Sequence, residues 1–335
     1  MDIAKIIMLV TGGLVLFIYA VTMLGRTIKN MAGDKTQYWV GKFTTNTISA
    51  VLTGVIITIL LDSSSAVIII AIVLVNSGVL KLRQAMGIVL GANIGTTFSS
   101  QIIAMDVGKY SPVFLFLGLV LMFASKNKNI SNTGRTLLFF GMLFFGLFTM
   151  ENAVEPLKNH EKFTEWMSRL DDPITGALTG AFVTLIIQSS SATVGMAITL
   201  AKKGLIELSA GIAVMLGAEL GTCSDTLIAT IKGSRQALKT GIFHVTFNLI
   251  SIILGLIMFY PFMSLIETIS DGAKLERQIA NAHMIFNTLG VLMFVFLIPT
   301  AEKLLNKILP DKQTAYIQLA EEVKEESAFD DIEVN

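Results

Sequence analysis

The sequence predicts an all-α integral membrane protein, because its apolar residues come in long blocks and not in short amphipathic periods. Of its 335 residues, 53% are hydrophobic and 15% are charged. The blocks recur along the chain at about 20 residues each, which is the length of a helix that crosses a bilayer. The spans are therefore expected to be helices and not barrel strands.

The first apolar block, Ile6–Leu24, is interpreted as the first membrane span. It follows Asp2 and Lys5 and has no extended basic start or small-residue cleavage pattern, so it does not fit a signal peptide. One cysteine, Cys223, and three scattered histidines argue against a disulfide and a zinc site. The GxxxxGK[ST] motif of nucleotide hydrolysis is absent from the sequence. We expect no cofactor, no enzymatic activity and no nucleic-acid partner.

The chain contains two copies of one unit. Residues 53–97 and 179–223 align without a gap at a constant offset of 126. Both copies contain the block SSSA, at Ser63–Ala66 and Ser189–Ala192, and both end in a glycine-rich segment. The similarity extends weakly to the span before each serine block, so each repeat comprises several spans.

The number of spans between the serine blocks predicts that the second repeat is inverted relative to the first. Three membrane crossings separate the two serine blocks. If each serine segment enters and leaves the membrane on the same side, an odd number of crossings gives the second repeat the opposite orientation in the membrane. We therefore expect about seven transmembrane helices plus two re-entrant helical hairpins, around residues 48–76 and 174–202. One long crossing at each block is the alternative. The hairpin is preferred because adjacent polar residues at mid-depth suit the tip of a broken helix pair.

The predicted organisation is two transmembrane repeats and a tail. Residues 1–125 form the first repeat, residues 126–310 form the second repeat with extra C-terminal spans, and residues 311–335 form an acidic cytoplasmic tail. The distribution of lysine and arginine between the loops slightly favours an amino terminus outside the cell and a carboxyl terminus in the cytoplasm. The protein is thus expected to cross the cell membrane several times.

The serine blocks are candidates for binding an oxyanion. A helix that begins just after the serines leaves its first amides free and directs its positive dipole end at the break, and the hydroxyls add donors. Two such tips that meet near the bilayer centre would supply the convergent donors that a tetrahedral anion such as phosphate needs. The alternative is that the serines only cap two helix breaks. The predicted substrate-binding residues are Ser63, Ser64, Ser65, Ser189, Ser190 and Ser191.

The segments GANIGTT, residues 91–97, and GAELGTC, residues 217–223, are candidates for cation binding. Paired glycines with threonine and a side-chain amide or carboxylate can unwind a helix, and the freed carbonyls and side-chain oxygens are hard ligands that suit sodium. Close helix packing through small residues is the alternative. The predicted cation-binding residues combine these segments with the tips: Asp62, Gln188, Thr193, Asn93, Thr96, Thr97, Glu219 and Thr222.

Several further polar residues fall at membrane depth. Asp62, Glu219 and Asp225 are carboxylates there, and such residues are costly and by default mark a functional path. His244 and His283 each precede an asparagine by four residues in an H-x-x-F-N pattern, so histidine and asparagine share one helix face. Interhelical hydrogen bonding is favoured over proton transfer as the role of these pairs.

Taken together, these residues resemble the sodium/phosphate cotransporter family, type II class, in a bacterial form. The family carries two QSSSA motifs in inverted repeats, each followed by a GANIGT-like segment, and bacterial members add the H-x-x-F-N pair. The resemblance runs from Met23 to about Pro299. It implies sodium-driven uptake of inorganic phosphate by alternating access in the inner (plasma) membrane. Phosphate would lie between the two tips, with sodium ions around them.

Two positions depart from the family pattern. Asp62 stands where the family usually has glutamine, and Glu219 stands where it usually has asparagine, whereas Gln188 and Asn93 keep the amides. Ionised carboxylates would repel a phosphate dianion unless cations neutralise them or burial keeps them protonated. The same fold could therefore carry another anion, or couple to protons through Asp62 and Glu219.

Two other classes of protein are weaker alternatives. An intramembrane serine hydrolase would pair Ser64 or Ser190 with His244 or His283. The sequence has no GxSxG elbow, and a duplicated serine block suits a two-tip binding site better than one nucleophile. A non-transporting membrane sensor or scaffold is the other alternative.

Overall fold

A computed structural model describes residues 3–32, 40, 42–105, 107–124, 127–230 and 233–310. Every regular element in these ranges is an α-helix or a short 3-10 helix, and none of these residues lies in a strand. The all-α prediction is thus confirmed for the described residues. The predicted acidic tail, residues 311–335, lies outside them.

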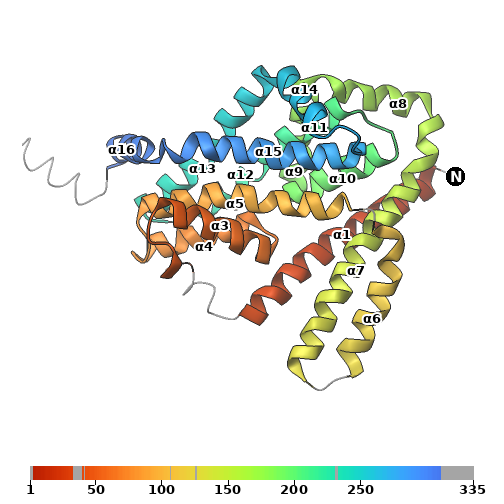
Figure 1. Cartoon of the computed structure of the whole chain (residues 1–335), viewed down its shortest axis with the longest axis horizontal. Helices are drawn as coiled ribbons and strands as arrows, with labels where there is room; N and C mark the ends of the chain where they lie inside the picture. The colour runs from red at the N-terminus through yellow and green to blue at the C-terminus, as the bar shows by residue number, and fades with distance from the viewer. Residues whose placement is uncertain are drawn as a thin grey trace, which may run out of the picture.

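The helices follow one another with short connections (Figure 1). In the first half they are α1 (Ile3–Ala32), α3 (Thr47–Leu61), α4 (Ser64–Asn76), α5 (Leu82–Ile103) and α6 (Ser111–Ala124). In the second half they are α7 (Lys128–Val154), α8 (Glu161–Ser168), α9 (Pro173–Ile187), α10 (Ser190–Lys202), α11 (Leu208–Gly221), α12 (Cys223–Thr230), α13 (Arg235–Ile257), α14 (Phe259–Ile269), α15 (Leu275–Val295) and α16 (Ile298–Ile308). Three 3-10 helices, Gly108–Tyr110, Glu155–Asn159 and Arg169–Asp171, complete the described elements.

Several helices are long and apolar enough to cross a membrane. In the described part there are five, or up to seven if two bent helix pairs each count as one span. Large apolar side chains such as Phe116, Phe182 and Ile257 are exposed on the outer surface, where a soluble protein would place polar groups. The protein is therefore a multi-pass membrane protein.

The first serine block breaks a helix and the chain turns back there. Gly87 of α5 lies against Ala50 of α3, and Gly95 lies against Thr58, so α3 and α5 run parallel. Gln84, at the start of α5, donates a hydrogen bond to the carbonyl oxygen of Thr44, just before α3 begins. α4 consequently carries the chain back from the break to the end at which α3 started.

The second serine block repeats this path. Gly176 of α9 lies against Ala213 of α11, and Gly221 lies against Thr184, so α9 and α11 are also parallel. α10 therefore returns the chain between them. The breaks fall inside residues 48–76 and 174–202, where the hairpins are predicted. That these hairpins are re-entrant in the bilayer stays a prediction.

The two broken pairs approach the centre of the molecule from opposite ends of α5. α3 accompanies the N-terminal part of α5, whereas Gly195 of α10 faces Ile103 at its C-terminal end. The helices that precede the two blocks, α1 and α7, are antiparallel, because Gly13 lies against Met150 while Met31 contacts Thr136. This arrangement is the one that an inverted repeat would produce.

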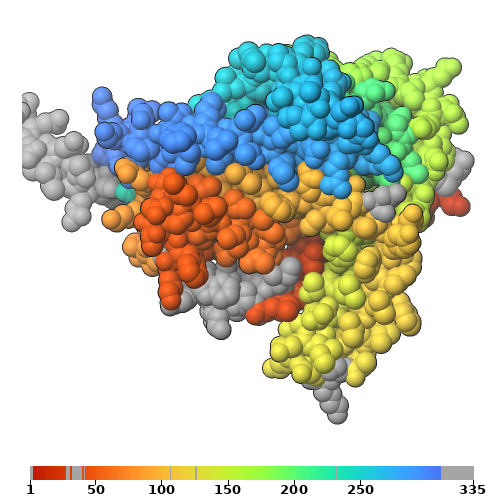
Figure 2. Space-filling model, viewed as in Figure 1, coloured from red at the N-terminus to blue at the C-terminus, as the bar shows by residue number. Residues whose placement is uncertain are grey.

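α5 lies at the centre of the described fold. It packs against α3, α4, α10, α13 and α15. In the space-filling view the blue C-terminal helices α15 and α16 lie along the orange α5 (Figure 2). α6 and α7 form an arm that projects from the other helices together with part of α1 (Figure 1). α5 therefore contacts helices of both repeats.

The glycine-rich segments pack helices closely, and the first of them lies within an unbroken helix. α5 continues without a break through Gly91 and the residues that follow it, and α11 is continuous until Gly221. A Cβ atom at Gly91 would overlap the carbonyl oxygen of Val51, and one at Gly217 would overlap that of Ala177. The expectation that paired glycines unwind the helix is thus wrong for α5, where they let two backbones touch. In the second segment α11 ends at Gly221 and α12 begins at Cys223, with a turn at Thr222 between them.

Replacement of Gly217 by alanine should force α9 and α11 apart and destabilise the fold by about 1–3 kcal/mol, the usual cost of overpacking. Thermal unfolding in detergent would show a lower midpoint. Gly12→Ala is the matched control, since a Cβ at Gly12 meets no atom within 4 Å. Equal unfolding midpoints for the two variants would contradict this account of the glycines.

Candidate functional site

Both breaks use the same local structure. Ser63 caps the N-terminus of α4, and its Oγ accepts a hydrogen bond from the amide of Ala66 at 3.2 Å. Ser189 caps α10 in the same way, with the amide of Ala192 at 3.2 Å. The first amides of any helix have no partner within that helix, so those not met by the cap are available to an anion.

The residue before each cap has a left-handed backbone. Asp62 has φ of 49° and Gln188 has φ of 58°, and these are the non-glycine residues of positive φ in the described part of the chain. Such a conformation is uncommon for residues with a Cβ and is typical of functional positions. Equivalent residues of the two repeats are therefore held in one unusual conformation.

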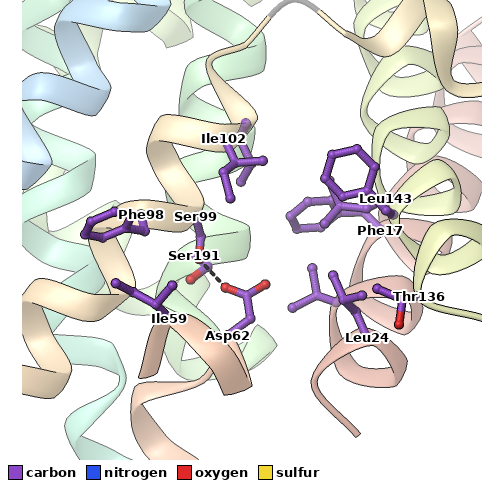
Figure 3. A pocket seen from close by; sticks show the side chains of 13 residues that line it. Phe17, Leu24, Ile59, Asp62, Phe98, Ser99, Ile102, Thr136, Leu143 and Ser191 are labelled. Carbon is purple, nitrogen blue, oxygen red and sulfur yellow. Dashed lines mark hydrogen bonds between the residues drawn. The ribbon is translucent and has the colours of Figure 1, made fainter. Parts of the chain in front are cut away.

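The tip of the first repeat lies beside the tip of the second. Asp62 and Ser191 line one cavity of about 220 Å³. Ser99 of α5 donates a hydrogen bond to Asp62 Oδ1 there. In Figure 3, Asp62, Ser99 and Ser191 gather on one side of the cavity, and Phe17 and Leu143 face them from the other. Most of the other lining residues are apolar: Val21, Leu24, Ile59, Phe98, Ile102, Ile103, Thr136 and Phe140.

A second contact joins the first tip to the second repeat. Ser65 Oγ of the first tip donates to Asp225 Oδ2 at 3.2 Å. Asp225 lies in the first turn of α12, after the glycine-rich segment of the second repeat. Each tip thus meets a residue from the other repeat.

A buried hydrogen-bonded chain crosses between the repeats. His283 Nδ1 lies 2.7 Å from Ser100 Oγ of α5, and His283 Nε2 lies 2.8 Å from Glu219 Oε1 of α11. His283 and Ser100 have no exposed surface, and Glu219 is 3% exposed. A carboxylate buried this deeply needs such a partner, because an unpaired charge there is very costly.

The other histidine has an equivalent arrangement. His244 Nδ1 lies 3.0 Å from Thr226 Oγ1, and Asn248 Nδ2 lies 3.1 Å from His244 Nε2. Asn248 also donates to the carbonyl oxygen of Glu219 at 3.2 Å. Both histidines therefore make interhelical hydrogen bonds, as predicted. Neither contacts Ser64 or Ser190, so no serine–histidine pair of the predicted hydrolase type exists at these positions.

The predicted cation-binding hydroxyls and amide are turned toward their own helices. Asn93 donates to Val89 O, Thr96 to Ala92 O, Thr97 to Ile94 O and Thr222 to Glu219 O. Thr193 accepts from Thr184 Oγ1 at 2.7 Å and donates to Ser189 O. Asp62 lines a cavity with Ser191 of the second tip, whereas these residues bond within their own repeats, and their cation role stays a prediction.

Ser99, Ser100 and Thr226 are site residues that the sequence analysis did not single out. These residues lie just beyond Thr97 and Cys223, the last pair of the aligned repeats described above. The same offset of 126 continues for several residues and pairs Ser99 with Asp225 and Ser100 with Thr226. A longer alignment would therefore have marked these positions.

Comparison with known proteins supports a common origin for the two halves. The family described as Na+/Pi-cotransporter matches residues 16–152 and again residues 149–296. The chain belongs to this family. It is a transporter family, and members of it are expected to transport and not to catalyse.

Relatives of this Na+/Pi-cotransporter family member carry different names. An uncharacterized protein, YqeW of Bacillus subtilis, is 29% identical over 307 residues, which cover 90% of this chain and 98% of YqeW. The putative inorganic phosphate export protein YjbB of Escherichia coli K12 is 24% identical over 83% of this chain, which spans 51% of YjbB. Sodium-dependent phosphate transport protein 2A of Ovis aries is 29% identical over 25% of this chain and 14% of its own length. No solved structure matches the chain significantly.

Replacement of Glu219 by alanine should leave His283 without its partner in the protein interior. Removal of one member of a buried pair typically costs about 3–5 kcal/mol of unfolding free energy. Glu219→Gln retains a hydrogen-bonding side chain and should cost clearly less. Thermal unfolding in detergent would measure both, with the exposed Glu161→Ala as control. An equal fall in unfolding free energy in Glu219→Ala and Glu219→Gln would argue against the Glu219–His283 contact.

Proposed function

We propose that this protein is a secondary active carrier that moves inorganic phosphate across the inner (plasma) membrane with sodium, by alternating access. The observation that carries the proposal is that both helix breaks border one cavity, through Asp62 of the first and Ser191 of the second, in a membrane protein of the Na+/Pi-cotransporter family. The bilayer surrounds the carrier. The carboxyl terminus would face the cytoplasm and the amino terminus the outside.

The two serine blocks supply donors suited to phosphate. The first turns of α4 and α10 carry free amides and hydroxyls from Ser64, Ser65, Ser190 and Ser191. Ser190 and Ser191 are buried, at 3% and 7% exposure, so an anion bound there would be largely removed from water. Hydrogen bonds to a charged oxygen are stronger in such surroundings.

Sodium fits the carboxylates beside the tips. Asp62 and Asp225 would repel a phosphate dianion unless a cation lies with each of them. Carboxylate and hydroxyl oxygens are the ligands that hard cations prefer. Within the described residues, no three His, Cys, Asp or Glu side chains gather to hold a metal ion, so a site for a transition metal is not favoured over sodium there.

Coupling to protons is a second candidate, favoured by one contact. Glu219 Oε1 lies against His283 Nε2 and not against an open polar space. A glutamate and a histidine that share one proton could take it up and release it during transport. Cys223 is another titratable group close to Glu219, since its Sγ lies 3.6 Å from the Glu219 carbonyl oxygen.

In a sodium-coupled carrier the sodium gradient sets the direction of phosphate transport, and proteoliposomes allow each direction to be tested. Purified protein in proteoliposomes should accumulate radiolabelled phosphate when an inward sodium gradient is imposed. An outward sodium gradient should drive phosphate out of preloaded vesicles, as the name of YjbB would suggest for that protein. Transport under a proton gradient without sodium would support the second candidate. Folded protein that moves phosphate under neither gradient would overturn the proposal.

Loss of a tip hydroxyl should weaken phosphate binding. Ser190→Ala removes one donor to a charged oxygen, which is typically worth about 1.5–3 kcal/mol, so affinity should fall by roughly 10- to 100-fold. Phosphate-dependent thermal stabilisation would report the change without transport. Ser168→Ala, an exposed serine on α8, is the matched control. Unchanged affinity in Ser190→Ala would exclude this hydroxyl from the site.

A further inference from the structure

The cavity beside the first break has two unlike sides. Asp62, Ser99 and Ser191 gather on its polar side (Figure 3). The opposite side, which we call the α1–α7 wall, consists of apolar residues of α1 and α7: Phe17, Val21, Leu24, Phe140 and Leu143. The hydroxyl of Thr136, also from α7, bonds within its own helix. The serines explain only the polar side, because an apolar wall offers phosphate no hydrogen bond.

One oxygen of the Asp62 carboxylate faces this wall. Ser99 donates to Oδ1, and no other side chain of the described residues bonds the carboxylate. In Figure 3 the second oxygen, Oδ2, points away from Ser99 and into the space before the α1–α7 wall. A carboxylate oxygen without a partner in apolar surroundings is unfavourable, and a positive group beside it would remove that cost.

The charge of the cavity selects among classes of ligand. Within the described part of the chain, Asp62 lines the cavity and no lysine, arginine or histidine does. An anion against the α1–α7 wall would be repelled by this carboxylate. A neutral apolar molecule would leave the carboxylate oxygen unpaired, and a small inorganic cation would leave the wall without contacts. A cation with an apolar body satisfies both sides.

The rings and the volume of the cavity indicate the size of that body. Phe17 and Phe140 of the wall and Phe98 of α5 line the cavity, and the face of an aromatic ring attracts a cation. The cavity has a volume of about 220 Å³. A cavity of about 150 Å³ in another protein is large enough to bind benzene. There is thus room for one ring with a short charged chain, or for an alkyl chain of similar size.

We propose that this cavity binds a protonated primary amine with one ring or a short alkyl chain. The ammonium group lies against Asp62 Oδ2 and the apolar body covers the α1–α7 wall. A primary ammonium has three N–H donors, and the Ser191 hydroxyl is a second acceptor that lines the polar side. The site goes beyond the proposed carrier function and does not depend on it, because binding can be measured without transport.

Calorimetric titration of the whole purified chain with 2-phenylethylammonium, in detergent and a sodium-free buffer, measures the site. Asp62→Asn removes the charge and keeps a residue that tolerates the left-handed backbone, so the affinity should fall by roughly 10- to 100-fold. Glu161→Gln, which removes an exposed carboxylate on α8, is the matched control and should bind the amine as the natural chain does. Gel filtration and circular dichroism report the fold of each variant.

A series of ligands tests both sides of the cavity on the natural chain, without any substitution. From methylammonium to butylammonium, the affinity should rise by about fourfold for each CH₂ group that the α1–α7 wall covers. 2-Phenylethanol has the same ring and chain as 2-phenylethylammonium but no charge. It should bind roughly 10- to 100-fold more weakly than the amine.

Other results would overturn the assignment. Equal affinities for 2-phenylethanol and 2-phenylethylammonium would make the cavity a pocket for neutral apolar molecules, such as lipid acyl chains. Equal affinities for methylammonium and butylammonium would exclude the α1–α7 wall, and undiminished amine affinity in folded Asp62→Asn would exclude the carboxylate. Phosphate transport without amine binding would leave the carrier function standing and remove this site. Amine binding without phosphate transport under either gradient would leave the site and remove phosphate as the cargo.

Discussion

A helix that breaks inside apolar surroundings leaves backbone groups that must find polar partners, and the rest of this structure is organised around two such breaks. Each break places a left-handed residue and a capping serine at the centre of the molecule. Water is scarce at membrane depth, so the partners have to come from the protein or from a ligand. The capping serine of each repeat supplies one of them, and a side-chain bond between Ser65 and Asp225 also ties the first break to the opposite repeat.

This exchange of partners makes each tip depend on both halves of the chain. Asp62 and Ser191 come from different repeats and line one cavity. A movement of one repeat past the other would change the surroundings of both carboxylates at once. An ion bound at either position would therefore favour one arrangement of the repeats, which is the physical requirement for coupling.

The histidine network connects the same elements behind the tips. His283 on α15 contacts α5 through Ser100 and α11 through Glu219, so one side chain joins the helices that follow the two serine blocks. Buried polar networks of this kind are favourable only when every member is satisfied. The network is thus a structural link between α5, α11 and α15.

The sequence by itself determined the all-α class, the duplication, the positions of both helix breaks and the family. These properties depend on local hydrophobicity and on repeated residues, which are visible along the chain. Close backbone contact at Gly91 and Gly217 was one of two interpretations of the glycine segments, and only packing decided between them. The preference for an unwound helix was wrong for the first segment, where α5 is continuous and the facing helix accepts no Cβ.

Only the tertiary structure decided which polar residues meet. Ser65 and Asp225 are 160 residues apart, and Ser100 and His283 are 183 apart, so no local pattern joins them. The predicted threonines of the glycine segments bond instead to carbonyl oxygens of their own helices, because a helical hydroxyl readily reaches the preceding turn. The sequence shows which residues can donate or accept hydrogen bonds, whereas the packing of the two repeats decides which of them bond to each other.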